Sequence, residues 1–228
     1  MQPYFFPYIG YFQLINAVDK FIIYNDVNYI NKGWINRNNF LINNAPYCLT
    51  VPLSKASQNK LIYEVEILDD FKWKNKLKRT IELSYIKAPF FKEVYALLDN
   101  LLKQNYSSIS EFNVAGIIEV CKYLSINTII KENSQHYQNS GLSGQHRILD
   151  ICTKESATHY INPIGGVNLY DKNYFIENNV SISFLQTTSV NYKQFNNEFV
   201  PSLSIIDILM FCSKNQIKNE LLPKFELK

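Results

Sequence analysis

The spacing of apolar residues along the chain predicts short strands that alternate with helices. Apolar runs typical of buried strands occupy residues 20–27, 48–53, 61–68, 127–130, 159–162 and 181–185. Apolar residues three or four positions apart, typical of helices, occupy residues 73–85, 94–102, 108–121, 144–154 and 204–211. Ser-x-x-Glu at 108–111 and Ser-x-x-Asp at 204–207 have the form of capping boxes, which predicts that helices begin there.

The order of these elements favours an α/β fold with a mostly parallel sheet flanked by helices. Residues 28–70 are richer in strand and loop patterns, so we expect a strand-rich insertion or an antiparallel edge there. No internal repeat, low-complexity segment or linker divides the sequence. Because 228 residues suit one domain, we expect a single domain over residues 1–228.

The first twelve residues, MQPYFFPYIGYF, have the composition of a shaped loop inside a folded domain. Pro3 and Pro7 prevent a helix from forming before Gly10, and the stretch lacks the basic start of a secretory signal. In α/β folds a functional loop follows the carboxyl end of a strand. We therefore expect a strand of a few residues ahead of Met1.

Composition and charge limit the partners of the protein. The 23 basic and 20 acidic residues are well mixed, without the concentrated basic face that nucleic acids require, so we expect no nucleic-acid partner. The cysteines and histidines lack metal-ligand spacing, so we expect no metal site, and the thiols are typical of a reducing, cytoplasmic compartment. No apolar run reaches the length of about 18 residues that spans a membrane, so we expect no membrane insertion.

Seven blocks of sequence, taken in order, carry a resemblance to a known family. They are QPYFFPYIGYF (2–12), NDVNYINKGWINRN (25–38), LTVP (49–52), SYIKAPFF (84–91), SGLSGQHRILDIC (140–152), HYINPIGGVNLYD (159–171) and FVPSLSIIDILM (199–210). Together they resemble the WbqC-like family over nearly the whole chain. Members of that family usually carry a short apolar strand just before the Gln-Pro pair.

The resemblance implies a role in making surface polysaccharides such as O-antigen. Genes of the family lie in clusters beside enzymes that make nucleotide-linked amino sugars. The implied reaction is the transfer of an acyl or aminoacyl group to the amine of a nucleotide-linked amino sugar, which would be the partner. The donor could be a coenzyme A thioester, an acyl-tRNA or an acid activated by ATP.

Two other functions stay open on the sequence alone. One is a scaffold protein that holds a sugar nucleotide without turnover. The other is a nucleotidylyltransferase, because the turns before two helices resemble nucleotidylyltransferase-like folds, in which helix starts hold ATP phosphates. The HxGH signature of those enzymes is absent, and so are a Walker loop, a Gly-x-Ser-x-Gly elbow and a Rossmann glycine fingerprint.

Asp26 and His146 are the candidate catalytic residues. Asp26 follows the predicted strand that begins at residue 20, where α/β folds place functional groups, although aspartate is also a common turn residue. Its carboxylate could accept a proton from the attacking sugar amine or hold a ligand hydroxyl. His146 shares a turn with a predicted anion site and is the better placed of the three histidines for acid–base work.

That anion site is predicted at the start of the helix over 144–154. Ser143 and Gly144 would present free N–H groups there, with Arg147 beside them. Gly165 and Gly166 would allow the backbone to approach a ligand closely. Ordinary tight turns are the alternative explanation for these glycines.

Two further segments supply candidate substrate-binding residues. Lys32, Trp34, Asn36 and Arg37 could bind phosphates, stack on a ring and contact hydroxyls, or they could form a solvated loop with one buried tryptophan. Gln2, Tyr4, Tyr8, Gly10 and Tyr11 could form a wall for a polar, ring-shaped ligand such as a sugar nucleotide, or an aromatic plug under the sheet.

Overall fold

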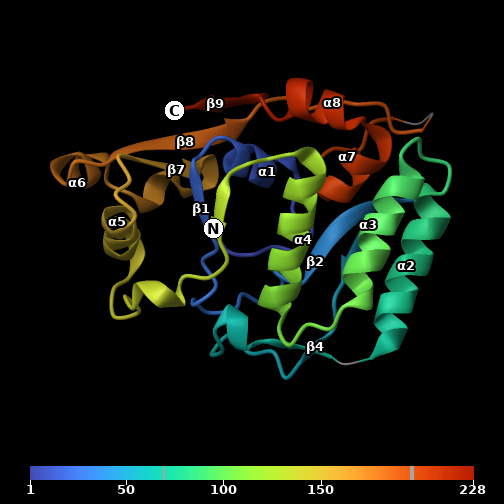
Figure 1. The fold of residues 1–228 in the computed structure, drawn as a ribbon, viewed down its shortest axis with the longest axis horizontal. Coiled ribbons are helices and arrows are strands. Elements are labelled where there is room, and N and C mark those ends of the chain that lie inside the picture. The colour runs from blue at the N-terminus through green and yellow to red at the C-terminus, as the bar shows by residue number, and fades with distance from the viewer. Residues whose placement is uncertain (69, 196–197) are drawn as a thin grey trace.

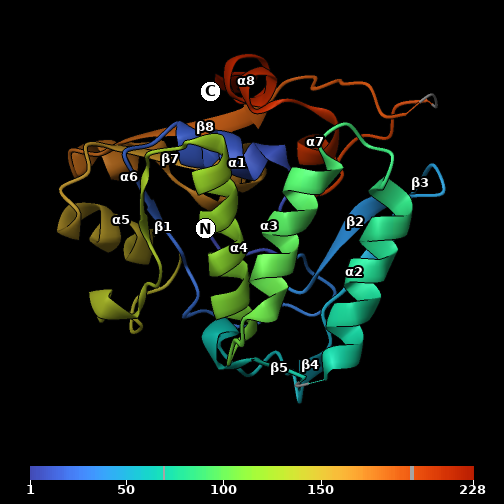
Figure 2. The ribbon, with the colours of Figure 1, turned by 45° about the vertical axis from the view of Figure 1, so that its right-hand side comes forward.

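The computed structural model of the chain describes residues 1–68, 70–195 and 198–228 (Figure 1). Three helices, α2 (Phe71–Tyr85), α3 (Phe91–Lys103) and α4 (Ile109–Leu124), lie side by side on one side of the molecule. Two others, α5 (Gly144–Lys154) and α6 (Lys172–Glu177), lie on the opposite side (Figures 1 and 2).

Two pairs of parallel strands form the α/β part of the fold. β1 (Lys20–Ile22) pairs with β6 (Ile129–Lys131), and β7 (His159–Pro163) pairs with β8 (Ser181–Thr187). β9 (Phe225–Leu227) runs antiparallel along the other edge of β8. The mixed α/β class is thus confirmed. The described strands form separate small sheets in place of the single mostly parallel sheet that we expected, because β1 and β7 do not bond to each other.

The strand-rich region that we expected over residues 28–70 begins with an antiparallel hairpin. It is formed by β2 (Arg37–Ile42) and β3 (Ala45–Thr50). The two residues between them, Asn43 and Asn44, have φ values of 51° and 61°, as a tight two-residue turn requires. The predicted strand 48–53 therefore overlaps the second strand of this hairpin. Its partner, β2, was not predicted because its first half is polar.

The predicted strand over 61–68 is wrong in its first half. Ile62–Glu64 forms a 3₁₀ turn, in which the Glu64 carboxylate accepts a hydrogen bond from the backbone N–H of Leu61 at 2.8 Å. Only β5 (Glu66–Ile67) is extended, and it pairs with β4 (Leu53–Ser54). The Glu64 side chain satisfies this local backbone donor and so favours a turn. The alternation of apolar residues, from which the strand was predicted, is not sensitive to such a bond.

The predicted helices and their starts are confirmed. Ser108 Oγ accepts from the N–H of Glu111 at 3.2 Å at the start of α4, and Ser204 Oγ accepts from the N–H of Ile206 at 3.3 Å at the start of α7 (Ile205–Phe211). Sequence patterns did not predict the elements that close the chain, which are α8 (Lys214–Gln216), the π turn Ile217–Leu221 and β9. No helix in the described ranges is both long and apolar enough to cross a membrane.

The opening loop lies in the core. Phe5 and Phe6 are buried, and Phe6 has a φ of 40°. The side-chain amide of Asn38 donates to the carbonyls of both residues, at 3.0 and 2.7 Å. The amide of Asn113 donates to the carbonyl of Pro3 at 3.0 Å. Buried carbonyls of an irregular loop need such partners, so these asparagines fix the path of the loop.

The helix that follows, α1 (Ile9–Asn16), is buried almost along its whole length. Gln13 lies wholly inside the protein, where its amide donates to the carbonyls of Leu221 and Lys224 at 2.8 and 3.0 Å. The Gln13 side-chain oxygen accepts from the Thr187 hydroxyl at 2.8 Å. One glutamine therefore ties the start of the chain to β8 and to the C-terminal segment.

Asp207 is a carboxylate with no exposed surface. It accepts hydrogen bonds from the Tyr85 and Tyr192 hydroxyls at 2.9 and 2.6 Å and from the Gln194 amide at 2.7 Å. Burial raises the pKa of the Asp207 carboxyl above its ordinary value of 3.8, although these three donors oppose the rise. The Tyr85 hydroxyl also accepts from the N–H of Leu41 at 2.8 Å, so this cluster joins α2, α7 and β2.

The raised pKa predicts a pH-dependent loss of stability. The folded state binds the Asp207 proton more tightly than the unfolded state, so the protonated carboxyl contributes to the free energy of unfolding. This contribution is complete below pH 3.8 and is lost as the pH rises through the raised pKa. Replacing Asp207→Asn removes it while keeping the shape of the side chain. In urea unfolding from pH 4 to 7, the stability of the wild type should fall relative to D207N as the pH rises. A difference that stays constant with pH would contradict the prediction.

Candidate functional site

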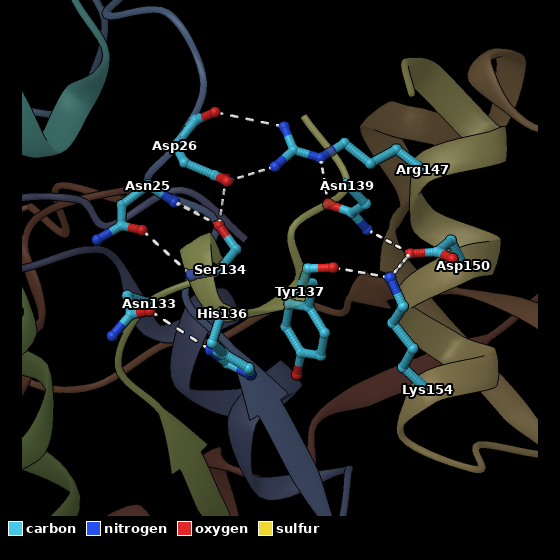
Figure 3. Close-up of polar contacts among 10 residues, drawn as sticks. All are labelled: Asn25, Asp26, Asn133, Ser134, His136, Tyr137, Asn139, Arg147, Asp150 and Lys154. Atoms are coloured by element: carbon cyan, nitrogen blue, oxygen red, sulfur yellow. Dashed lines mark hydrogen bonds and ion pairs between the residues drawn. The ribbon is translucent and has the colours of Figure 1, made fainter. Parts of the chain in front are cut away.

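A buried ion pair joins Asp26, in the segment that follows β1, to Arg147 of helix α5 (Figure 3). Arg147 bonds to the Asp26 carboxylate through one terminal nitrogen and donates to the Asp26 backbone carbonyl at 3.3 Å through the other. Its Nε donates to the Asn139 side chain at 2.8 Å. The side chains of Arg147 and Asp26 are each less than a tenth exposed. The structure thus brings together Asp26 and Arg147, both predicted as site residues. Arg147 donates its hydrogen bonds to groups inside the protein.

The segment between β6 and α5 completes this network. The Ser134 hydroxyl donates to the other oxygen of the Asp26 carboxylate. The Asn139 amide donates to Asp150 at 2.7 Å, and Lys154 forms an ion pair with Asp150 at 2.7 Å (Figure 3). Hydrogen bonds from Lys154 and Asn139 lower the pKa of the Asp150 carboxyl. The carboxyl end of β1, the segment after β6 and α5 are therefore held as one unit.

A wall of tyrosines borders the ion pair. The Arg147 guanidinium lies over the Tyr24 ring, 4.8 Å from its centroid. The Tyr160 hydroxyl donates to the Asn162 side chain at 2.9 Å and lies 3.3 Å from the Tyr170 hydroxyl. Burial raises the pKa of Tyr24, Tyr160 and Tyr170, so all three hydroxyls keep their protons.

The start of α5 lies beside this wall. Ser143 precedes the helix without a side-chain capping bond, and Gly144 has a φ of 52° with open space where a Cβ would stand. His146 is exposed, and its Nδ1 lies 2.8 Å from the Tyr174 hydroxyl. Ser143 and Gly144 leave the first turn of the helix accessible, as the predicted anion site requires.

The Gly-Gly turn after β7 differs between its two residues. Gly165 has open space around it, whereas a Cβ on Gly166 would collide with the Asn162 amide. Close approach at Gly166 is thus to the protein's own side chain. Gln145 ties this region to α5, because its side-chain oxygen accepts from the N–H of Asp171 at 2.8 Å.

We refer to this group of residues as the edge site. It consists of Tyr24, Asp26, Ser143, Gly144, His146, Arg147, Tyr160, Asn162, Gly165, Tyr170 and Tyr174. Sequence reasoning missed the four tyrosines, Asn162, and the supporting residues Ser134 and Asn139. Ser134 could have been found, because it follows the predicted strand 127–130 as Asp26 follows the strand before it.

The polar loop that contains Lys32 and Trp34 lies against the opening loop, where the N–H of Phe5 donates to the Trp34 carbonyl at 3.0 Å. Arg37 folds back to donate to the carbonyls of Lys32 and Gly33. Trp34 is 47% exposed, which contradicts the alternative of a buried tryptophan. The Arg37 guanidinium lies over its ring, 6.0 Å from the centroid.

Asn36 in the same loop is committed to the fold. Its amide donates to the Val51 carbonyl at 2.9 Å, and its side-chain oxygen accepts from the Tyr29 hydroxyl at 2.9 Å. Together with the contacts of Arg37, this leaves Lys32 and Trp34 as the members of the predicted set whose side chains can reach a ligand.

The five candidates in the opening stretch divide into two groups. Tyr11 is buried and donates to the Gln2 carbonyl at 3.0 Å, and a Cβ on Gly10 would collide with the Tyr8 ring, so both positions serve packing. Gln2 and Tyr4 are half-buried and Tyr8 is exposed. These three can still form a wall for a ligand.

Comparisons with known proteins identify the family of this chain. A model of the WbqC-like protein family matches residues 2–219. The chain belongs to this family. It is 27% identical over 211 residues to the uncharacterized protein Rv1507c of Mycobacterium tuberculosis. The aligned region covers 92% of this chain and 90% of that protein. No solved structure matches the chain. The resemblance noted in the sequence is thereby confirmed over nearly its full length.

The buried ion pair predicts a large cost for removing its cation. Arg147→Met leaves the Asp26 carboxylate buried without its partner and should lower the free energy of unfolding by about 3–5 kcal/mol. Lys154→Met removes a cation of the same network that is 43% exposed and should cost about 1 kcal/mol or less. Urea unfolding measures both. Equal costs would show that the Arg147 pair does not hold the edge site together.

Proposed function

We propose that the edge site binds a nucleotide-linked amino sugar and that the protein adds an acyl or aminoacyl group to its amine, in the biosynthesis of surface polysaccharide such as O-antigen. Membership of the WbqC-like family supports the pathway. The observation that carries the site is the bond between Asp26 and Arg147, because it fixes an accessible helix start beside the carboxyl ends of the parallel strands. α/β proteins bind their ligands at that position.

In this proposal, the nucleotide diphosphate lies at the start of α5. The first-turn N–H groups and the Ser143 hydroxyl are free to donate to phosphate oxygens. The Tyr24 hydroxyl keeps its proton and can donate to an oxygen of the sugar, and the Tyr170 oxygen can accept from a sugar hydroxyl. The Tyr160 proton is already donated to Asn162. The exposed ring of Trp34 offers a stacking surface for a base or a sugar.

The geometry favours His146 over Asp26 as the proton acceptor. Both carboxylate oxygens of Asp26 accept bonds from Ser134 and Arg147, so we give Asp26 a positioning role. His146 is exposed, and the Tyr174 contact engages only its Nδ1, so Nε2 can take the proton. With a thioester donor, the sugar nitrogen attacks the acyl carbon, an amide bond forms, the C–S bond breaks and the thiolate leaves. His146 accepts the proton that the nitrogen loses.

The same proposal implies a cytoplasmic protein. Within the described residues the four cysteines are all free, and three of them are buried, which suits a reducing compartment. Free thiols without pairing are the rule in the cytosol, where nucleotide-linked intermediates and coenzyme A thioesters are available to a soluble enzyme.

The proposal predicts both binding and turnover. A matching nucleotide-linked amino sugar, present at about 100 times its Kd, should stabilise the protein by about 2.7 kcal/mol in thermal unfolding. We would test uridine, guanosine and deoxythymidine diphosphate sugars, each with and without an amino group. Mass spectrometry should then detect the acylated sugar when a coenzyme A thioester, or ATP with an acid, is added.

His146→Gln should keep the ligand-induced stabilisation and lower turnover about 100-fold or more, because it removes the proton acceptor and leaves the phosphate contacts in place. His159→Gln is the matched control, since His159 is also exposed but lies at the other end of β7, with Nε2 2.9 Å from the Ser183 hydroxyl. Stabilisation without turnover under every donor would favour a scaffold. Stabilisation by ATP alone, with pyrophosphate release, would favour a nucleotidylyltransferase.

A further inference from the structure

Helix α2 holds the excess positive charge of the protein. It contains five basic residues and one acidic residue, namely Lys72, Lys74, Lys76, Lys78, Arg79 and Glu82. Its net charge is therefore +4, whereas the whole chain carries +3. Basic and acidic residues are well mixed along the sequence as a whole, but this one helix departs from that balance. α2 is also the outer of the three neighbouring helices, because α3 lies between it and α4 (Figure 2).

Two of these cations fasten α2 to its neighbour. Lys78 forms an ion pair with Asp99 of α3. Lys74 donates through Nζ to the carbonyl of Gln104, just after α3, at 2.7 Å. The charges of Lys74 and Lys78 therefore belong to the packing of the two helices.

The other three cations lie on the outer face of α2. This face is a stripe whose members follow one another at intervals of four and three positions, which places them on one side of a helix. Its members are Lys72, Lys76, Arg79, Leu83 and the C-cap residue Ile86, all of them exposed. Leu83 and Ile86 are 64% and 56% exposed, and Phe71, at the start of the helix, is 71% exposed. We refer to these six residues as the α2 stripe.

The cations of the stripe do not stabilise the helix. The first turn of α2 has no acidic residue and the last turn has no basic residue. Since the start of a helix carries a partial positive charge, the Lys72 ammonium is repelled there. Lys72 and Lys76 form no ion pair with any residue that the structure describes, and Arg79 pairs with Glu82 at 2.9 Å. Residues that act against local stability in this way are typical of functional surfaces.

The combination of cations and exposed apolar side chains fits the surface of an anionic lipid bilayer. Lysines attract anionic headgroups, while phenylalanine, leucine and isoleucine enter the boundary between headgroups and acyl chains. A nucleic acid would engage the cations through its phosphates but would leave Leu83 and Ile86 in water. A second copy of this chain would bring like charges together. The bilayer surface is the partner that uses the whole stripe.

We propose that the α2 stripe binds the surface of an anionic lipid bilayer, with the helix axis parallel to it. A rise of about 1.5 Å per residue places Lys72 and Ile86 about 21 Å apart, so the cationic and apolar parts meet the same surface. The helix lies on the bilayer and does not cross it. α5 lies on the opposite side of the molecule, so this contact leaves the start of α5 uncovered (Figures 1 and 2).

Co-sedimentation of the chain of residues 1–228 with vesicles tests the proposal. Vesicles of phosphatidylcholine that contain about 30% phosphatidylglycerol should bind the protein at least about tenfold more tightly than vesicles of phosphatidylcholine alone. The difference should disappear at about 1 M salt, because screening weakens the attraction between exposed charges. No sugar nucleotide is involved, so failure of the proposed function would leave this result unaffected.

The double variant Lys72→Gln and Lys76→Gln should bind the anionic vesicles about 25-fold more weakly, since each cation near such a surface contributes about fivefold. Lys218→Gln with Lys224→Gln is the matched control, because both lysines are exposed in the C-terminal segment and the change in net charge is the same. The control should lose less than about threefold. The Tm of the α2 variant should be unchanged or slightly raised, because a cation leaves the positive end of the helix.

Leu83→Ser should weaken vesicle binding about fivefold, because it removes an apolar side chain from the contact. Leu169→Ser, at a leucine that is 71% exposed elsewhere in the chain, should leave binding unchanged. Equal binding to the two kinds of vesicle, or equal losses in the two lysine pairs, would overturn the proposal. So would a single-stranded RNA that binds more tightly than the vesicles and depends on Lys72 and Lys76 but not on Leu83. That result would assign the stripe to nucleic acid.

Discussion

The Arg147 guanidinium is the group on which the arrangement of the edge site depends. A cation taken out of water is costly unless acceptors surround it, and no single segment of this chain could supply them all. Asp26 supplies a carboxylate and a carbonyl from the segment after β1, and Asn139 supplies an amide oxygen from the segment before α5. The cation thus fixes the distance between a strand end and a helix. His146, the residue just before it in the chain, lies at the surface.

The opening loop meets a related constraint with neutral groups. Its carbonyls lie in the core without regular secondary structure, so the amides of Asn38 and Asn113 and the hydroxyl of Ser204 take the place of a strand partner. The Phe5 and Phe112 rings pack 5.9 Å apart beside them. The backbone of the loop therefore belongs to the core, while Gln2, Tyr4 and Tyr8 remain available at the surface.

Sequence patterns predicted the elements that depend on local interactions, namely the helices. The helices over 73–85, 94–102 and 144–154 agree with α2, α3 and α5, because helical spacing and caps act within a few residues. The strands were predicted less well, since a strand's length depends on a partner far along the chain. Residues 20–27 read as one apolar run, yet pairing with β6 ends at Ile22.

The candidate site divides in the same way. Asp26 was found because function often follows a buried strand, and the structure places it beside Arg147. Asn36 and Gly10 were predicted to bind a ligand, but both are engaged by residues far along the chain. Asn36 donates to the Val51 carbonyl, and Thr187 leaves no room for a Cβ at Gly10. Tyr24, Tyr160 and Tyr170 were missed because nothing in their sequence positions shows that three separate segments bring them together.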